Sequence, residues 1–250
     1  MSTLKFSKAN TKLAKLYKVK ALRRWLKKNR RIYSLDLLSG HSCPFALECL
    51  SKAVKSEDGK LSIVDGPHTL FRCYAASQEA LFPDTFNLRK HNFDVLKILG
   101  TVEEMADVIT ASLPQNAGIV RIHSAGEFFV RRYFQAWLAV AYRHPDRLFY
   151  AYTKAVRYWI KDREILPANF VLTASRGGID DALIDTHNLR SVKVIYHPSE
   201  ANGLEIDNDD RHAAIPEWSN RDFALVIHGV QPKGSEAAAA LQRLKQEAKA

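Results

Sequence analysis

The chain has 250 residues and a formal net charge of +10, from 37 Lys or Arg against 27 Asp or Glu. Its apolar content of 46% is typical of a folded protein, and its length allows one large domain or two small ones. No run approaches the ~20 apolar residues of a membrane span, and no apolar stretch near the start is typical of a signal peptide. Three cysteines are too few for a disulfide scaffold.

The excess positive charge lies at one end of the chain. Residues 5–31 contain 12 Lys or Arg and no acid, which leaves 25 basic and 27 acidic residues elsewhere. The composition of this segment favours helix, but Leu13 and Leu16 lie about half a turn from Leu22 and Trp25. We therefore predict a basic helical arm over residues 1–31, broken and partly packed on the body, and one α/β domain over residues 32–250.

Short apolar runs that alternate with helical patterns follow the arm. Such alternation predicts a parallel sheet with right-handed crossovers. Five or six such units suggest a partial or irregular (β/α) barrel with mostly parallel strands, and an open doubly wound sheet is the alternative. The predicted elements are strands at 33–38, 118–124, 147–153, 169–175, 191–197 and 223–228, and helices at 102–112, 128–143 and 179–189.

Polar side chains follow most of the predicted strands. The carboxyl ends of parallel strands meet at one edge of a sheet, so these side chains should line one pocket for a small-molecule substrate. The acidic loop 205–210 favours a solvated loop over a divalent-cation site, although Asp210 and His212 could reach the pocket rim. The pocket candidates are His123, Glu127, Lys154, Arg176, His197 and His228.

All three cysteines fall within 31 residues, at Cys43, Cys49 and Cys73. Three interpretations fit this spacing: buried free thiols, a zinc site with three cysteines and a histidine, and an iron–sulfur cluster. Three thiolates on a [4Fe–4S] cluster would leave one iron open to another ligand or a substrate. Spacing alone leaves the cluster and the free thiols open.

Several blocks of sequence, in order from about Tyr33 onward, resemble the phage "gene product 88" family. They are the segments 42–49, 72–75, 121–128, 149–154, 207–213 and 223–229. The resemblance implies phage origin and a cluster held by Cys43, Cys49 and Cys73. It does not cover the basic arm.

Ala125-Gly126-Glu127 is also similar to the glycine-glycine-glutamate motif of radical S-adenosylmethionine enzymes, which are partial barrels with a three-cysteine [4Fe–4S] cluster. The CxxxCxxC loop of those enzymes is absent here, because the third cysteine lies 24 positions beyond the second.

Together these features predict a phage iron–sulfur protein in the cytoplasm of the infected host. It would be a redox or radical-enzyme-like protein of unknown substrate. The wider similarity implies S-adenosylmethionine as a cofactor, but the missing CxxxCxxC loop argues against it. The alternatives are a zinc-bound structural or interaction protein and a nucleic-acid-binding protein that uses the arm. The arm residues for that role are Lys12, Lys15, Arg23, Arg24, Lys27, Lys28, Arg30 and Arg31.

Overall fold

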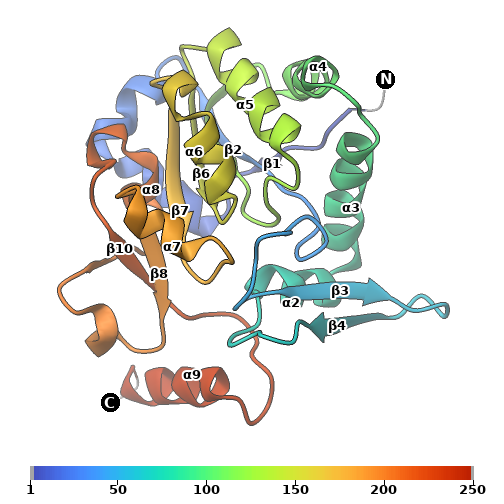
Figure 1. Cartoon of the computed structure of the whole chain (residues 1–250), viewed down its shortest axis with the longest axis vertical. Helices are drawn as coiled ribbons and strands as arrows, with labels where there is room; N and C mark the ends of the chain where they lie inside the picture. Colours follow the sequence, from blue (N-terminus) through green and yellow to red (C-terminus); the bar gives the residue numbers. More distant parts are fainter. Residues whose placement is uncertain (1–2, 249–250) are drawn as a thin grey trace.

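An eight-stranded sheet forms the centre of the computed structural model, which describes residues 3–248 (Figure 1). The first pair of strands is antiparallel, and every other neighbouring pair is parallel. In spatial order the strands are β1 (Ser7–Lys8), β2 (Arg31–Leu35), β5 (Ala117–Ile122), β6 (Leu148–Thr153), β7 (Phe170–Ser175), β8 (Ser191–Ile195), β10 (Phe223–Val226) and β9 (Glu205–Ile206). The predicted mostly parallel sheet is confirmed. Residues 1–2 of the predicted arm and 249–250 of the predicted domain lie outside the described residues.

The sheet does not close on itself, and the predicted partial or irregular (β/α) barrel is not confirmed. It ends at β1 on one side and β9 on the other, and each of these two-residue strands pairs with a single neighbour. From β2 to β10 the strands of the large sheet lie side by side in the order of the sequence. A doubly wound sheet reverses its strand order, so the alternative prediction of such a sheet is wrong.

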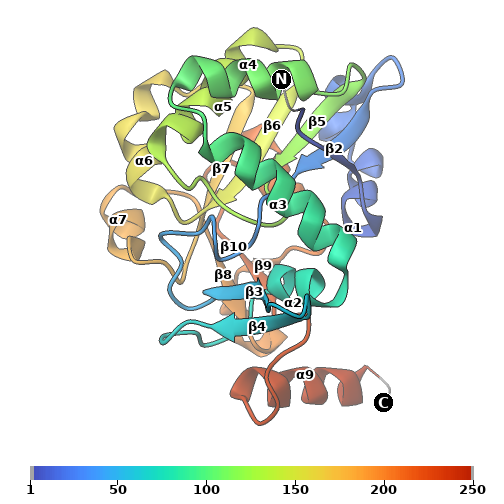
Figure 2. The same cartoon turned by 90° about the vertical axis from the view of Figure 1, so that its right-hand side faces the viewer.

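Helices cover one face of the sheet (Figures 1 and 2). Trp137 lies 6.0 Å from Phe149, and Phe134 lies 6.1 Å from Phe170, measured between ring centroids, so aromatic packing joins this layer to the sheet. The main helices here are α4 (Val102–Ser112), α5 (Arg131–Arg143), α6 (Val156–Lys161) and α7 (Asp181–Thr186), with the short 3₁₀ turn η3 (Arg163–Ile165). The predicted helix at 102–112 is confirmed in full, and that at 128–143 begins at Arg131.

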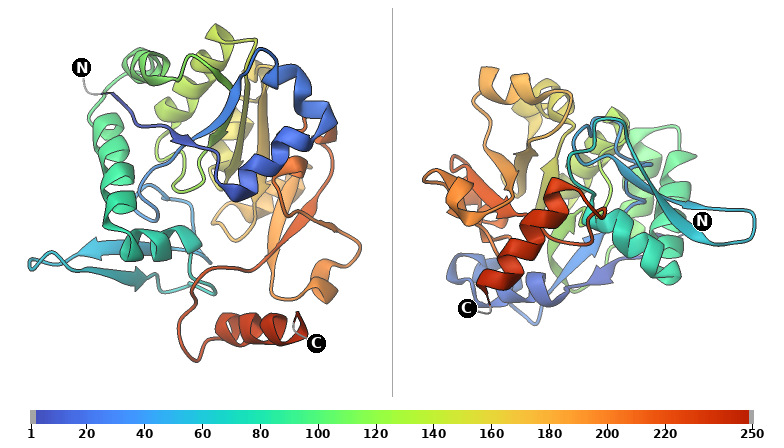
Figure 3. Two further views of the ribbon diagram at one scale, coloured as in Figure 1. Left: turned by 180° about the vertical axis from the view of Figure 1, so that it is seen from behind. Right: turned by 90° about the horizontal axis from the view of Figure 1, so that it is seen from below.

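The basic N-terminal segment covers the opposite face (Figure 3, left). It forms α1 (Thr11–Ala14) and the 3₁₀ helices η1 (Lys15–Lys18) and η2 (Lys20–Leu26), so the predicted broken helix is confirmed. Leu13, Leu16 and Leu22 are fully buried against residues of the sheet such as Val171 and Phe223. The segment is therefore a layer of the fold and does not project as a free arm. The short elements α8 (Arg211–Ala214) and η5 (Pro216–Trp218) pack beside it.

A third group of elements gathers below the sheet (Figures 1 and 2). They are the hairpin β3 (Ser51–Lys55) and β4 (Leu61–Asp65), the helices α2 (Tyr74–Leu81) and α9 (Glu236–Glu247), and the 3₁₀ turn η4 (Pro198–Ala201). Helix α3 (Pro83–Lys97) follows α2 and lies beside the sheet (Figure 1). Across the part of the chain that the structure describes, no helix has the length and hydrophobicity needed to cross a membrane.

Candidate functional site: a pocket at the carboxyl ends of the strands

A pocket of about 190 Å³ lies where β5, β6, β7, β8 and β10 end. The loop after β2, the first turn of α2 and residues 227–228 complete its wall. Parallel sheets of this kind bind ligands at this edge, because successive loops bring side chains together there. The polar and thiol side chains in the wall are Ser39, Cys43, Cys49, Arg72, Cys73, Tyr74, Arg121, His123, Ser124, Glu127, Tyr152, Lys154, Ser175 and His228.

Glu127 is held firmly on one side of the pocket. Its carboxylate accepts hydrogen bonds from the backbone N–H of Phe128 at 2.7 Å, the Thr153 hydroxyl at 2.8 Å and the backbone N–H of Lys154 at 2.6 Å. Burial raises the pKa of Glu127, although these hydrogen bonds favour its charged form. The side chain is thus fixed in position and does not swing into the pocket.

Gly126 makes this placement feasible. Its φ of +89° lies in the left-handed region, and a Cβ there would lie 2.6 Å from the Leu37 Cβ. Only glycine fits without displacing the loop after β2. The turn therefore brings Glu127 close to the cysteine-bearing loop.

Lys154 crosses from β6 to the end of β7. Its Nζ donates to the Ser175 carbonyl at 3.0 Å, to the Ser175 hydroxyl at 3.1 Å and to the Arg176 carbonyl. An ammonium group has three donors, so these bonds account for all of them. Lys154 therefore ties two strand ends together.

Three buried polar atoms of pocket-lining residues lack a hydrogen-bond partner within residues 3–248. They are His123 Nδ1, the Ser124 hydroxyl and the Tyr152 hydroxyl. The other ring nitrogen of His123 is 2.9 Å from the Tyr133 hydroxyl. Burial, with the nearby Arg121, lowers the pKa of His123 to about 3, so the imidazole is neutral at physiological pH. Buried polar atoms are normally paired, so these three atoms stand out among the residues that line the pocket.

A buried ionic network holds Arg121, one of the pocket-lining residues. Arg121 donates to Asp210 at 2.5 Å, Tyr150 donates to the same carboxylate at 3.1 Å, and Lys12 lies 2.8 Å from its other oxygen. Burial opposes ionisation of Asp210, but Arg121 and Lys12 outweigh it and lower its pKa. The Arg121 guanidinium also lies over the Tyr152 ring, 5.1 Å from its centroid. Arg121 is thus held against the pocket by a charge from the acidic loop.

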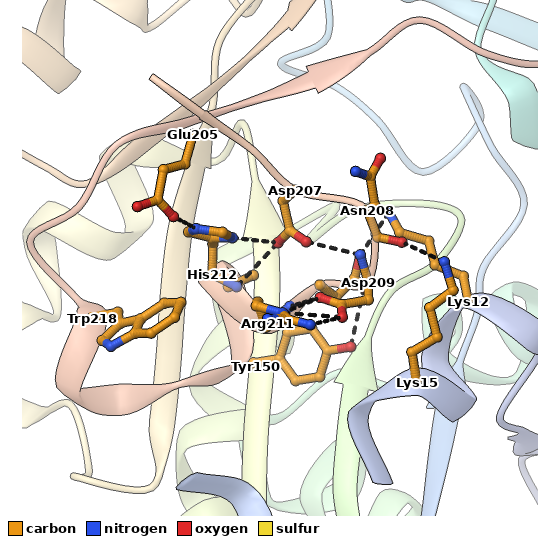
Figure 4. A network of polar contacts seen from close by, with 12 residues as sticks. Lys12, Lys15, Tyr150, Glu205, Asp207, Asn208, Asp209, Arg211, His212 and Trp218 are labelled. Atoms are coloured by element: carbon orange, nitrogen blue, oxygen red, sulfur yellow. Dashed lines mark hydrogen bonds and ion pairs between the residues drawn. The ribbon is translucent and has the colours of Figure 1, made fainter. Parts of the chain in front are cut away.

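The acidic loop is not the solvated loop that the sequence favours. Asp207, Asp209 and Asp210 are all buried, and Asp210 has no exposed surface. His212 lies between Glu205, at 2.5 Å, and Asp207, at 3.4 Å, with Trp218 beside its ring (Figure 4). The alternative of a divalent-cation site also fails, because no group of acidic, His or Cys side chains among the described residues could hold a metal ion.

The same finding overturns the iron–sulfur prediction. Cys43, Cys49 and Cys73 all line the pocket, but they do not form a group that could hold a metal ion in the described part of the chain. Burial raises the pKa of each thiol, to about 12 for Cys73. The Cys43 sulfur instead accepts from the Gly40 N–H at 3.3 Å. The predicted [4Fe–4S] cluster and the zinc alternative are therefore wrong, and with the cluster goes the open iron that S-adenosylmethionine would need.

The remaining sequence candidates divide between the pocket and the outer surface. His228 lines the pocket, where its ring centroid is 4.7 Å from that of Tyr74. Arg176 does not line it and pairs with Asp185 at 2.6 Å. His197 also lies outside, 2.9 Å from Glu247 of α9.

Tyr74 was not predicted as a pocket residue, and Arg121, Ser124 and Tyr152, although at predicted strand ends, were not among the pocket candidates. Arg121 had a visible signal, because a charged residue inside an otherwise apolar buried strand needs a partner. Tyr74 had none, since its hydroxyl reaches the Ser124 carbonyl only in the folded chain.

The predicted arm residues lie on the surface of the N-terminal layer. Lys12, Arg24 and Arg30 pair with Asp210, Glu217 and Asp146. Lys15 donates to the Asn208 carbonyl at 3.5 Å. The exposed cations without an ion-pair partner in residues 3–248 include Arg23, Lys27, Lys28 and Arg31.

Comparison with known proteins gives a family but no function. The model of the family described as Gene product 88 matches residues 4–246, so the chain belongs to this phage gene-product family. The match includes most of the basic N-terminal segment. No curated protein and no solved structure matches the chain.

Proposed function

We propose that this member of the gene product 88 family binds a small organic molecule with one or two hydrogen-bonding groups in the pocket at the strand ends. The three unpartnered polar atoms of His123, Ser124 and Tyr152 carry this proposal. A ligand with a hydroxyl or amide group would restore their hydrogen bonds.

The rest of the pocket favours an apolar body on that ligand. The pocket has an apolar lining as well as a polar one. The apolar residues are Phe71, Val192 and Val194 of β8, Leu225 of β10, and Ile227 just after β10. Ligand pockets commonly combine such a lining with a few polar groups that fix orientation.

The size of the pocket limits the ligand to about one ring. An engineered apolar cavity of about 150 Å³ accommodates benzene. A volume of about 190 Å³ therefore suits a substituted single ring and excludes a nucleotide or a larger cofactor as a fully enclosed ligand.

Phenol and benzene test this proposal directly. We expect phenol to bind at least about tenfold more tightly by ligand-observed NMR, because its hydroxyl can pair with the unpartnered atoms. Ser124→Ala should reduce phenol binding, whereas Ser219→Ala, on the exposed surface, should not. Leu225→Trp should fill the pocket and abolish binding of both. If phenol and benzene bound Leu225→Trp as tightly as they bind wild type, the two probes would be binding outside the pocket.

A second candidate function is nucleic-acid binding by the N-terminal layer. Ten of its 12 cationic side chains are exposed, and no acidic residue interrupts them. They lie on a segment fixed to the sheet by buried leucines, so their positions are set before any partner arrives. A row of fixed cations favours a phosphate backbone by releasing its counterions. The exposed ten are Lys5, Lys8, Lys15, Lys18, Lys20, Arg23, Arg24, Lys27, Lys28 and Arg31.

Salt dependence tests this second candidate. A variant with Arg23, Lys27, Lys28 and Arg31 changed to Ala should reduce the slope of log affinity against log salt by about 3, if all four contact phosphates. The matched control changes Lys55, Lys60, Lys233 and Lys245, which are exposed elsewhere. An equal reduction in both variants would mean that net charge alone acts, and the N-terminal layer would not be the interface.

A further inference from the structure

We infer that the N-terminal layer binds single-stranded nucleic acid and seats unpaired bases in two aromatic grooves, one on each side of η2. This inference rests on the second candidate function and specifies its substrate class. It arises from two surface grooves away from the pocket, both of which combine aromatic rings with cations.

The first groove, of about 310 Å³, lies between the N-terminal layer and η5. Trp218 and Ile215 provide apolar surface, and Lys18, Lys20 and Arg211 provide the cations. Trp218 is partly exposed, and the Arg221 guanidinium lies 4.9 Å from its ring centroid. Aromatic rings beside cations are the usual components of single-strand binding surfaces.

The second groove, of about 450 Å³, lies on the other side of η2, against the end of α5. Trp25, Tyr142, Pro145 and Pro167 form its surface, with Arg24 at the edge. Tyr142 is 58% exposed, and its hydroxyl is anchored to the Ile165 carbonyl at 2.9 Å. Its ring is thus held in one orientation with much of its surface open to solvent.

The two grooves are close enough for one strand to occupy both. Lys20 lines the first, and Arg24 and Trp25 line the second, all within the seven residues of η2. At about 2.0 Å per residue, η2 is roughly 14 Å long. Arg23 is exposed between them, where a backbone phosphate would pass.

The grooves distinguish single strands from duplexes. Exposed cations alone attract any phosphate backbone. Bases can reach an aromatic groove only when they are unpaired and can be turned outward, whereas the bases of a duplex are already stacked on each other. Charge complementarity selects a polyanion, and the aromatic surface selects one with free bases.

Fluorescence anisotropy with three labelled 12-mers tests the inference. The three ligands are oligo-dT, an abasic strand of equal length and a duplex. We expect oligo-dT to bind about tenfold more tightly than the abasic strand, because only oligo-dT has bases to stack. Tyr142→Ala and Trp218→Leu should each reduce that ratio. Phe82→Ala should not, since Phe82 is equally exposed, at 58%, but lies elsewhere.

The controls separate failure of the inference from failure of the proposed function. Circular dichroism of each variant checks that it is folded. Equal, salt-sensitive affinity for oligo-dT and the abasic strand would overturn base seating but leave phosphate binding intact. Tighter binding to the duplex than to oligo-dT would overturn single-strand preference. An absence of binding to all three at low salt would refute both the inference and the function beneath it.

Discussion

Two groups of positive charge in this molecule differ in how they are compensated. Arg121 is largely buried, with 11% of its side chain exposed, and its charge is balanced by Asp210 at 2.5 Å. The exposed cations of the N-terminal layer stand in solvent with few acids nearby. A buried charge requires a partner within the fold, whereas an exposed charge remains available to one outside it. Arg121 therefore contributes to the structure of the pocket, whereas the exposed cations of the N-terminal layer are available to bind a partner.

Removal of Asp210 should produce the largest loss of stability. Asp210→Ala would leave Arg121 charged and buried without its partner, at a cost of about 3–5 kcal/mol in the free energy of unfolding. Urea denaturation measures this change. Asp185→Ala is the control, because Asp185 is exposed and pairs with Arg176 on the surface. Similar midpoints for both variants would contradict a structural role for the buried network.

A smaller but still large effect should follow when the contact between the N-terminal layer and the sheet is weakened. Leu16 has no exposed surface, so Leu16→Ala should cost about 2–5 kcal/mol by the same measurement. Lys18→Ala, two residues away and exposed, should leave stability nearly unchanged. If Leu16→Ala were as stable as wild type, the segment would be a loosely attached arm after all.

Acid should destabilise the pocket through His123 by a smaller amount. Burial and Arg121 lower its pKa to about 3, so between about pH 6.5 and pH 3 the unfolded chain binds a proton that the folded chain does not. Stability therefore falls as the pH falls through this window. Between pH 7 and pH 5, wild type should lose about 2 kcal/mol more than His123→Gln. If the free energy of unfolding changed equally with pH in the two proteins, His123 would take up a proton as readily in the folded chain as in the unfolded chain.

The smallest effect should come from an ion pair on the surface. Arg24 and Glu217 are 3.0 Å apart, with about half of each side chain exposed. Arg24→Ala should change the free energy of unfolding by less than about 1 kcal/mol, because solvent screens the pair. A loss as large as that of Asp210→Ala would remove the distinction between buried and exposed charge.

Local patterns were sufficient to predict the six central strands of the sheet and the helices α4 and α5, because short buried strands and an amphipathic helix each repeat at their own period. The helices α3 and α9 were not predicted. The 118–124 run and the 102–112 helix lie at or near their predicted bounds. The hairpin was not predicted, since the side chains of β4 are only partly buried or exposed and β4 lacks a strong apolar signal.

The candidate site was less predictable, because its chemistry depends on contacts between distant residues. The cysteine positions suggested a common site, and the three residues do line one pocket, but spacing could not decide between free thiols and a metal site. Asp210 is 89 residues from Arg121, so the acidic loop looks solvated until the fold is known. The charge of residues 5–31 was evident from the sequence, whereas the direction in which its leucines face was not.

The N-terminal layer has a consequence for how the protein is made. Leu13 packs in the same buried cluster as Phe223, although the two residues are far apart in the sequence. At about 5–20 residues per second, a ribosome needs roughly 10–40 s to make the segment between them. The contact between Leu13 and this part of the sheet therefore forms only after that delay.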